Sequence, residues 1–458
     1  MKNYSEMANE VIRRRDQYDA KRKKRKKATR IFFPLFALLV VVGVLLFSGL
    51  GDNHSEIAKA ANLMLGIQRN PAEGTENLLE DSRILTDFAV RLLQTEMKEG
   101  ENVLISPLSV IESLGMTING ADSSTREQME QVLGLSAEEL GRFMYSYQES
   151  LPRGEKCQLL QANSIWFRAD EKVQVRQDFL QINADYYDAE MFQVPFDSHL
   201  AGQVNEWISE KTKGAIPRVL DDASEDAALY LINALSFEAE WGQKFPIYNT
   251  RNGEFLLESG QKVTVRYLFD TEYQYLKDDR VSGFMKSYAS YLGRKYVFVA
   301  LLPKEGLSVE DYVTGLSGDD LHSLILGAKH QAVLAKIPKF DVTYGSELSG
   351  SLKEMGMTKA FDKREADFSR MASVNGTKEK SGKTSEIQLS KVFHKTALTL
   401  NEWGTRASAA TIAEADLGEE AEDYEEVSLM RPFVYAIVDD ETGFPIFLGI
   451  CQQPNAAE

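Results

Sequence analysis

Residues 31–50 form a run of twenty residues without a charged side chain, and no other stretch limits the possible structures of this chain so strongly. As a helix, which rises about 1.5 Å per residue, this run would be about 30 Å long, enough to cross a bilayer. The preceding ten residues, KRKKRKKATR, are strongly basic, and such segments stay on the cytoplasmic side. We therefore expect residues 1–30 to be a cytoplasmic tail, residues 31–50 an uncleaved transmembrane signal-anchor, and the remainder to be extracellular at the cell membrane.

A cleaved signal peptide is the main alternative, because Ala58-Lys59-Ala60 has the small-x-small form of a cleavage site. That site lies about ten residues beyond the apolar run, and the run is longer than the apolar region of a signal peptide. A buried core helix of this length would normally show a polar face, which residues 31–50 lack. Residues 51–79 are expected to be a tether with at most one short helix, within residues 55–67.

The net charge of −17 is unevenly distributed along the chain. Residues 1–30 contain twelve Lys or Arg and four Asp or Glu, so they carry +8 and the rest carries −25. A nucleic-acid-binding protein needs a basic face to neutralise phosphates, so the acidic body excludes that class. Cys157 and Cys451 are far apart and lack a metal-binding spacing; we expect buried free thiols, with a single disulfide as the alternative.

From about residue 80 the pattern is typical of a globular protein. Apolar residues recur at helical spacing in three segments: residues 82–100, 137–151 and 201–220. Runs rich in β-branched and aromatic residues predict strands in six segments: residues 157–167, 227–241, 272–290, 294–303, 330–344 and 431–450, the last containing a hairpin turn at 439–443. Helices come mainly first and strands mainly later, which favours one α+β domain over residues 80–458.

The usual signatures of enzymes are absent from the sequence. None of the five histidines (His54, His199, His322, His330 and His394) belongs to an HExxH motif, and no nucleophile elbow or phosphate-binding loop occurs. Ser106 or Ser109 could pair with His394 as nucleophile and base, but no oxyanion motif or acidic orienting residue accompanies them. We expect these residues to be buried hydrogen-bonding groups, and the protein to be no enzyme and to need no cofactor or metal.

Four blocks, in order, resemble the serpin family. They are NVLISPLSVIESLGMTINGADSSTREQMEQVLGL (102–135), LINALSFEAEWGQKF (231–245), KVFHKTALTLNEWGTRASAAT (391–411) and RPFVYAIVDDETGFPIFLGICQQP (431–454). The matching positions are Asn102, Ser106, Pro107, Ser109, Gly120, Asn233, Ala234, Phe237, Trp241, Pro432, Phe433, Phe447, Gly449 and Pro454. The resemblance covers nearly all of residues 80–458.

The resemblance implies a serpin fold: a large central β-sheet, surrounding helices and an exposed reactive-centre loop, here about residues 402–430. In serpins a target protease cuts this loop and is trapped covalently, and the cleaved loop inserts into the central sheet. The resemblance also implies a polar cluster under the strands that separate, formed by Ser106, Ser109, Asn233 and His394. It implies a loop hinge formed by Glu402, Gly404, Thr405, Ala407, Ala409 and Thr411.

Insertion would make the loop a strand, in which alternate side chains face the core. Every second residue from Thr405 to Ala415 is small: Thr405, Ala407, Ala409, Thr411, Ala413 and Ala415. The other positions are mostly polar: Arg406, Ser408, Ala410, Ile412, Glu414 and Asp416. A bulky or charged inward residue would hinder entry, so this separation favours inhibition. Trp403 and Arg406 stand where inhibitors commonly have acids; Trp403 precedes the alternating run, and Arg406 lies at one of its outward positions.

The scissile bond has two candidates. The family register, counted from Glu402, places the cut between Gly418 and Glu419, whereas a specificity pocket would prefer to bind the side chain of Leu417 and cut before Gly418. Residues 414–426 hold eight acids and no base, which argues against trypsin-like targets. The acids either solvate the loop or steer a basic protease.

We therefore expect a monomeric, membrane-tethered inhibitor of extracellular serine proteases of the elastase, chymotrypsin or subtilisin type. Inhibition of papain-like cysteine proteases is a further possibility, because these enzymes mainly recognise the residue before the cut position, here Leu417 if Gly418 precedes the bond. The alternatives are a non-inhibitory serpin-fold binding or chaperone module and, less favoured, a membrane-bound hydrolase.

Overall fold

A computed structural model describes residues 60–224, 226–374, 387–405 and 424–457. The apolar run 31–50 and most of the expected reactive loop, residues 406–423, lie outside these ranges. Within them, no helix is both long enough and apolar enough to cross a membrane. The structure thus describes the globular part of the chain and the two ends of the loop.

One sheet has eight strands and contains the first residues of the expected loop; it is here called sheet A. Its order is β1 (Ala61–Asn62), β6 (Glu190–Val194), β4 (Cys157–Arg168), β7 (Leu229–Glu240), β16 (Gly404–Thr405), β15 (Lys391–Asn401) and β13 (Phe340–Glu347), with β3 (Arg153–Gly154) paired to β4. Strands β7 and β15 also pair directly, in parallel, below β16. Long strands β4 and β7 confirm two of the strand predictions.

A second sheet has nine strands and contains the C-terminus. Its order is β17 (Glu425–Ser428), β12 (Lys329–Pro338), β9 (Lys262–Lys277), β10 (Val281–Ser287), β11 (Tyr296–Pro303), β18 (Phe433–Asp439), β19 (Pro445–Cys451) and β2 (Val103–Ile105), with β8 (Arg251–Leu256) paired to β9. The expected C-terminal hairpin is confirmed, because β18 and β19 pair antiparallel. A small third sheet joins β5 (Val173–Val175) and β14 (Ala372–Val374).

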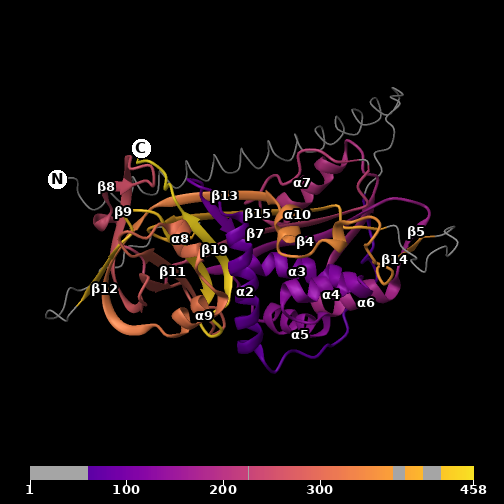
Figure 1. The fold of residues 1–458 in the computed structure, drawn as a ribbon, viewed down its shortest axis with the longest axis horizontal. Helices are drawn as coiled ribbons and strands as arrows, with labels where there is room; N and C mark the ends of the chain where they lie inside the picture. The colour runs from indigo at the N-terminus through magenta and orange to yellow at the C-terminus, as the bar shows by residue number, and fades with distance from the viewer. Residues whose placement is uncertain (1–59, 225, 375–386, 406–423, 458) are drawn as a thin grey trace, which may run out of the picture. The chain divides into compact units, whose positions relative to one another are not determined.

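Helices lie on both faces of sheet A (Figure 1). One face carries α3 (Pro107–Ile118), α4 (Ser123–Leu133), α5 (Ala137–Gln148) and α6 (Gln177–Tyr187), and the other carries α7 (Leu200–Lys211). Each side has its own hydrophobic core; the smaller one, beneath α7, includes Trp166, Tyr230 and Leu200. The remaining helices are α2 (Leu78–Glu96), α8 (Val309–Thr314), α9 (Gly318–Leu326), α10 (Ser349–Glu354) and the 3-10 turns η1 (Ile247–Asn249) and η2 (Lys359–Phe361).

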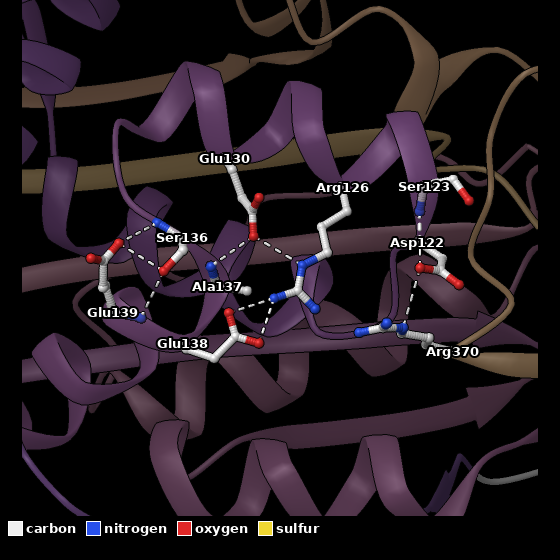
Figure 2. A network of polar contacts seen from close by, with 9 residues as sticks. All are labelled: Asp122, Ser123, Arg126, Glu130, Ser136, Ala137, Glu138, Glu139 and Arg370. Carbon is white, nitrogen blue, oxygen red and sulfur yellow. Dashed lines mark hydrogen bonds and ion pairs between the residues drawn. The ribbon is translucent and has the colours of Figure 1, made fainter.

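Local sequence signals determine where several helices begin. A capping box starts α5, because the Ser136 side chain accepts from the backbone of Glu139 while the Glu139 carboxylate accepts from the backbone of Ser136. Figure 2 shows this box beside Arg126 of α4, whose guanidinium donates to Glu130 at 2.9 Å and to Glu138 at 2.6 Å. The short connection between α4 and α5 is therefore held by both backbone capping and ion pairs.

Two expectations about the chain before residue 80 differ from the structure. The short helix expected within residues 55–67 is wrong for the part that is described, because Ala61–Asn62 form an edge strand paired with β6 and a turn follows. The first long helix begins at Leu78. Hydrogen bonding to the edge of the sheet stabilises this segment more than a short helix with few apolar residues would. The folded unit thus includes residues that we expected to belong to the tether.

Candidate functional site

The candidate site is the line along which β7 and β15 meet, which we call the seam. Seven direct parallel pairs form the seam, from Lys391 opposite Tyr230 to Ala397 opposite Ser236. Above the seam the two strands do not pair with each other, because β16 lies between them. Sheet A is thus closed along the seam and already contains a short inserted segment at one end.

A buried polar cluster lies directly beneath the seam, and it unites the four residues predicted for it. Asn233 of β7 and His394 of β15 are register partners, and the Nδ1 of His394 is hydrogen-bonded to Oδ1 of Asn233. From α3 below, the backbone N–H of Ser106 donates to Nε2 of His394 at 3.0 Å, and the Ser109 hydroxyl donates to Oδ1 of Asn233 at 3.4 Å. All four residues are at most 1% exposed. The cluster joins the two seam strands to each other and to the helix under them.

These contacts determine the protonation of His394. Because Nε2 accepts a hydrogen bond from a backbone N–H, the proton of the neutral ring is on Nδ1, which donates to Asn233. Burial lowers the pKa of His394 from its ordinary value to about 3, so the ring is neutral at physiological pH. A charged ring would lose the hydrogen bond from Ser106.

The free energy of unfolding should therefore depend on the pKa of His394. The folded pKa lies below the ordinary value near 6.5, so the stabilisation is complete above about pH 6.5 and is lost as pH falls towards about 3. We expect urea denaturation at pH 4 to show a larger loss of stability in the wild type than in His394→Gln, each measured relative to its own value at pH 7.5. Equal losses in both proteins would contradict a contribution from His394.

The geometry does not support a serine nucleophile at this cluster. The Ser106 hydroxyl donates to the carbonyl of Ile446 at 2.9 Å, and His394 faces the backbone nitrogen of Ser106 instead of its hydroxyl. The Ser109 hydroxyl contacts the carbonyl of Ser106 and the amide oxygen of Asn233. The serines and the histidine are therefore placed as a structural hydrogen-bonding group, as the sequence predicts.

The first residues of the predicted loop enter sheet A. After β15 the chain reverses at Glu402 and Trp403, and Gly404 and Thr405 pair antiparallel with both β15 and β7. Gly404 has φ +147°, and a Cβ atom there would lie 1.9 Å from the carbonyl oxygen of Ala239. Only glycine allows this approach to the backbone of β7. Thr405 is completely buried, and its hydroxyl lies 2.7 Å from that of Tyr288.

Glu402 holds the base of the loop. Its carboxylate accepts from Lys339 at 2.8 Å and from the Thr250 hydroxyl at 3.0 Å. Burial opposes ionisation of Glu402, but these hydrogen bonds and the charge of Lys339 hold its pKa below the ordinary value. The backbone carbonyls of Glu402 and Trp403 accept from Phe245 and Trp241, so the reversal is fixed on both sides.

The described residues include only part of the site predicted from the sequence. Glu402, Gly404, Thr405 and the polar cluster lie where they can act together at the seam. The hinge residues Ala407, Ala409 and Thr411 and the candidate scissile residues Leu417, Gly418 and Glu419 lie outside the described residues. Sequence reasoning missed Lys339 and Tyr288, since neither belongs to a recognisable local pattern and each contacts the loop base from a distant part of the chain.

The two cysteines are free and buried, which confirms the sequence prediction. Burial raises the pKa of the Cys157 thiol to about 12 and that of Cys451 further, so neither is a reactive thiolate at neutral pH. Neither belongs to the candidate site.

Comparison with known proteins agrees with this geometry. Residues 83–454 match the family model described as serpin, serine protease inhibitor. An uncharacterised serpin-like protein of Thermococcus kodakarensis is 27% identical over 380 residues, covering 81% of this chain and 85% of the relative. Leukocyte elastase inhibitor A of Mus musculus is 28% identical over 385 residues, covering 80% of this chain and 97% of the relative.

A solved structure has a higher sequence identity to this chain than these two relatives and a similar fold. The native state of the thermophilic serpin tengpin has a TM-score of 0.80 at 36% identity, covering 86% of this chain and all of tengpin. The latent state of tengpin matches with a TM-score of 0.70, covering 85% of this chain and again all of tengpin. The arrangement of this chain is thus more similar to the native form than to the latent form.

Proposed function

Because this chain belongs to the serpin family, we propose that it inhibits serine endopeptidases by offering residues 402–430 as a substrate loop. Attack by the protease serine on the scissile carbonyl would form an ester and release the new amino terminus. Insertion of the cleaved loop into sheet A would then carry the bound protease away from its starting position and distort it. The protein itself catalyses no turnover in this scheme.

One observation carries the proposal: Gly404 and Thr405 already occupy the end of the space that the loop would fill. These residues run antiparallel to both seam strands, which is the direction that a continued insertion needs. Below them the seam is closed by direct pairing and by the polar cluster. The uncleaved form therefore has an entry point and a barrier, as expected of a kinetically trapped inhibitor.

Continuing the register of β16 shows what each loop residue would meet. Thr405 lies opposite Leu400 and Ala239, so Ala407 would lie opposite Leu398 and Phe237. Leu398, Leu400, Phe237 and Ala239 are all buried. The small residues identified by parity would thus face the larger hydrophobic core of sheet A, which agrees with the inference drawn from the sequence.

In the same register, Thr411 would enter between Asn233 and His394. The Asn233–His394 hydrogen bond closes the seam and would have to break first. The Nδ2 group of Asn233 is buried and has no hydrogen-bond partner in the described structure. The hydroxyl of an inserted Thr411 would offer it an acceptor, so insertion would satisfy a polar group that the closed sheet leaves unpaired.

Both candidate scissile bonds lie beside Leu417, which favours a target protease that binds an apolar side chain. Leucine suits the pockets of elastase-, chymotrypsin- and subtilisin-like proteases, and one similar protein bears the name leukocyte elastase inhibitor. Leu417–Gly418 and Gly418–Glu419 are both retained as scissile bonds. The acids of residues 414–426 would favour a protease with a basic surface near its active site.

We further propose that the inhibitor is anchored at the cell membrane by residues 31–50, with the serpin domain outside. The support is the length of the uncharged run and the basic segment before it. Full-length protein should sediment with membranes, and a variant lacking residues 31–50 should not. Sedimentation of both variants alike would contradict this anchor.

Inhibition is tested by mixing the full-length protein in detergent with elastase or subtilisin. We expect an SDS-resistant complex and a released C-terminal fragment, whose mass identifies the bond: it begins at Gly418 or at Glu419. A parallel reaction with papain tests cysteine proteases. Complete cleavage of the loop without any complex would instead favour a non-inhibitory binding or chaperone role.

A further inference from the structure

A cavity of about 330 Å³ lies beside sheet A, away from the seam and the loop. Its walls come from the strands β3, β4 and β6 and from α3, α7 and the ends of α5 and α6. Its volume is in the range of small-molecule sites, which begins at about 300 Å³, and it exceeds what a single ion would fill. The residues that matter most are Glu112 at its base and Trp207 and Lys211 at its mouth.

Glu112 is an acid buried without a cation. It is 4% exposed, and none of the described residues forms an ion pair with it. Instead its carboxyl group accepts from the side-chain amides of Gln148 at 3.1 Å, Asn163 at 2.7 Å and Gln161. An isolated buried carboxylate is costly in proteins, so this group either stays protonated or gains a cationic partner.

The amides that donate to Glu112 leave their own oxygens unpaired. Gln148 and Asn163 are 5% and 9% exposed, and the Oε1 and Oδ1 atoms of these residues are buried without a hydrogen-bond donor. The hydroxyl of Tyr187 on the same cavity wall is also unpartnered. The cavity thus offers one carboxyl group and two free carbonyl oxygens, which suits a ligand rich in hydrogen-bond donors.

We propose that this cavity binds a small organic cation, with an ammonium or guanidinium group directed at Glu112, Gln148 and Asn163. A cationic N–H donor can satisfy the carbonyl oxygens and compensate the carboxylate at the same time. The alkyl part of the ligand would pack against the ring of Trp207. A bare metal ion fits less well, because amide N–H groups already occupy the carboxylate oxygens.

The charges around the cavity determine how binding depends on pH. Burial raises the pKa of Glu112 to about 8, and the nearby Asp188 carboxylate adds to the rise. Glu190 accepts from both Trp207 and Lys211 at the mouth, where Arg153 also lies, and Tyr187 stays neutral because burial raises its pKa. A cation would favour ionised Glu112, so binding at pH 7 should release a proton, and apparent affinity should rise with pH up to about 8.

The test is calorimetric titration of the full-length protein with n-butylammonium, with 1-butanol as the uncharged probe. We expect saturable binding of the ammonium alone, with proton release at pH 7 that is detected by comparing two buffers of different ionisation enthalpy. Glu112→Gln should lower the affinity by about tenfold or more, since a charge-assisted hydrogen bond is lost. Equal binding of both probes, or no proton release, would overturn the proposal.

Two variants control for effects on folding. Glu96→Gln changes another buried carboxyl, 5% exposed and bonded to Tyr344 and Ser351, and should leave binding unchanged. Lys211→Met removes a positive charge at the exposed mouth and should strengthen binding of the cation severalfold. If Glu112→Gln does not fold, the proposal is still tested by proton release on binding to the wild type and by the affinity of Lys211→Met for n-butylammonium. None of these readouts involves a protease, so they are independent of inhibition.

Discussion

Thr405→Arg is expected to convert the protein from an inhibitor of its target protease into a substrate. Thr405 is completely buried between β15 and β7, and its hydroxyl lies against that of Tyr288. An arginine there would overpack the entry point and bury a charge without a partner. Cleavage would still occur, but insertion would be too slow to trap the enzyme. We expect the number of inhibitor molecules consumed per inactivated protease to rise by about tenfold or more.

This experiment includes a substitution at a second inward position and a control substitution at an outward position. In the continued register Ala409 would lie opposite Leu235 and Thr396, both buried, so Ala409→Arg should behave like Thr405→Arg. Arg406 has the opposite parity and would lie opposite Thr399 and Glu238, both half-buried, so Arg406→Gln is the matched control and should leave the stoichiometry nearly unchanged. Titration of protease activity with each variant measures the effect. Wild-type stoichiometry in both inward variants would contradict insertion in this register.

Asn233→Ala is expected to make the uncleaved protein lose its inhibitory form spontaneously. The substitution removes the acceptor of the His394 Nδ1–H group, which leaves that buried donor unpaired at a cost of about 1–3 kcal/mol, and it removes one of the two acceptors of the Ser109 hydroxyl. These hydrogen bonds must break when the seam opens. Their loss therefore raises the free energy of the closed form more than that of the transition state for opening, and the activation free energy falls. Loss of activity at 37 °C should become about ten to a hundred times faster.

Asn183→Ala is the control for this second prediction. Asn183 is also fully buried, but it bonds to Phe179 and Asn119 on the helical side of the molecule, away from the seam. Its loss should lower the free energy of unfolding by a similar amount without speeding the loss of inhibitory activity. Residual inhibition over time, with native gels to detect polymers, separates the two variants. Equal rates in both would show that general destabilisation, instead of the seam, controls the conversion.

Local sequence patterns predicted the helices α2, α5 and α7 but not α4, α6, α8 or α9; among the strands they predicted β4, β7, β11 and the C-terminal hairpin. They missed α3, because all twelve of its residues are buried and no polar face marks its period. Its start is nevertheless encoded locally, since Ser106 caps the helix and Pro107 follows.

The site was predictable to a different extent. The polar cluster came from resemblance, because Asn233 and His394 are neighbours only through parallel pairing of strands far apart in sequence. The alternating small residues were visible in the sequence. The burial of the residues of β7 and β15 that they would lie against was not. No sequence pattern indicated a role for Glu112, because its position at the base of a cavity depends on the packing of four helices and three strands.

The most direct test of loop insertion is the structure of the protein after a single cleavage in its loop. Residues 406–415 should then form a new strand that runs antiparallel to both β7 and β15 and separates them. Ala407 should face Phe237 and Leu398, and Thr411 should stand where Asn233 and His394 now meet. A cleaved protein in which Lys391–Ala397 still pairs directly with Tyr230–Ser236 would contradict the proposed mechanism.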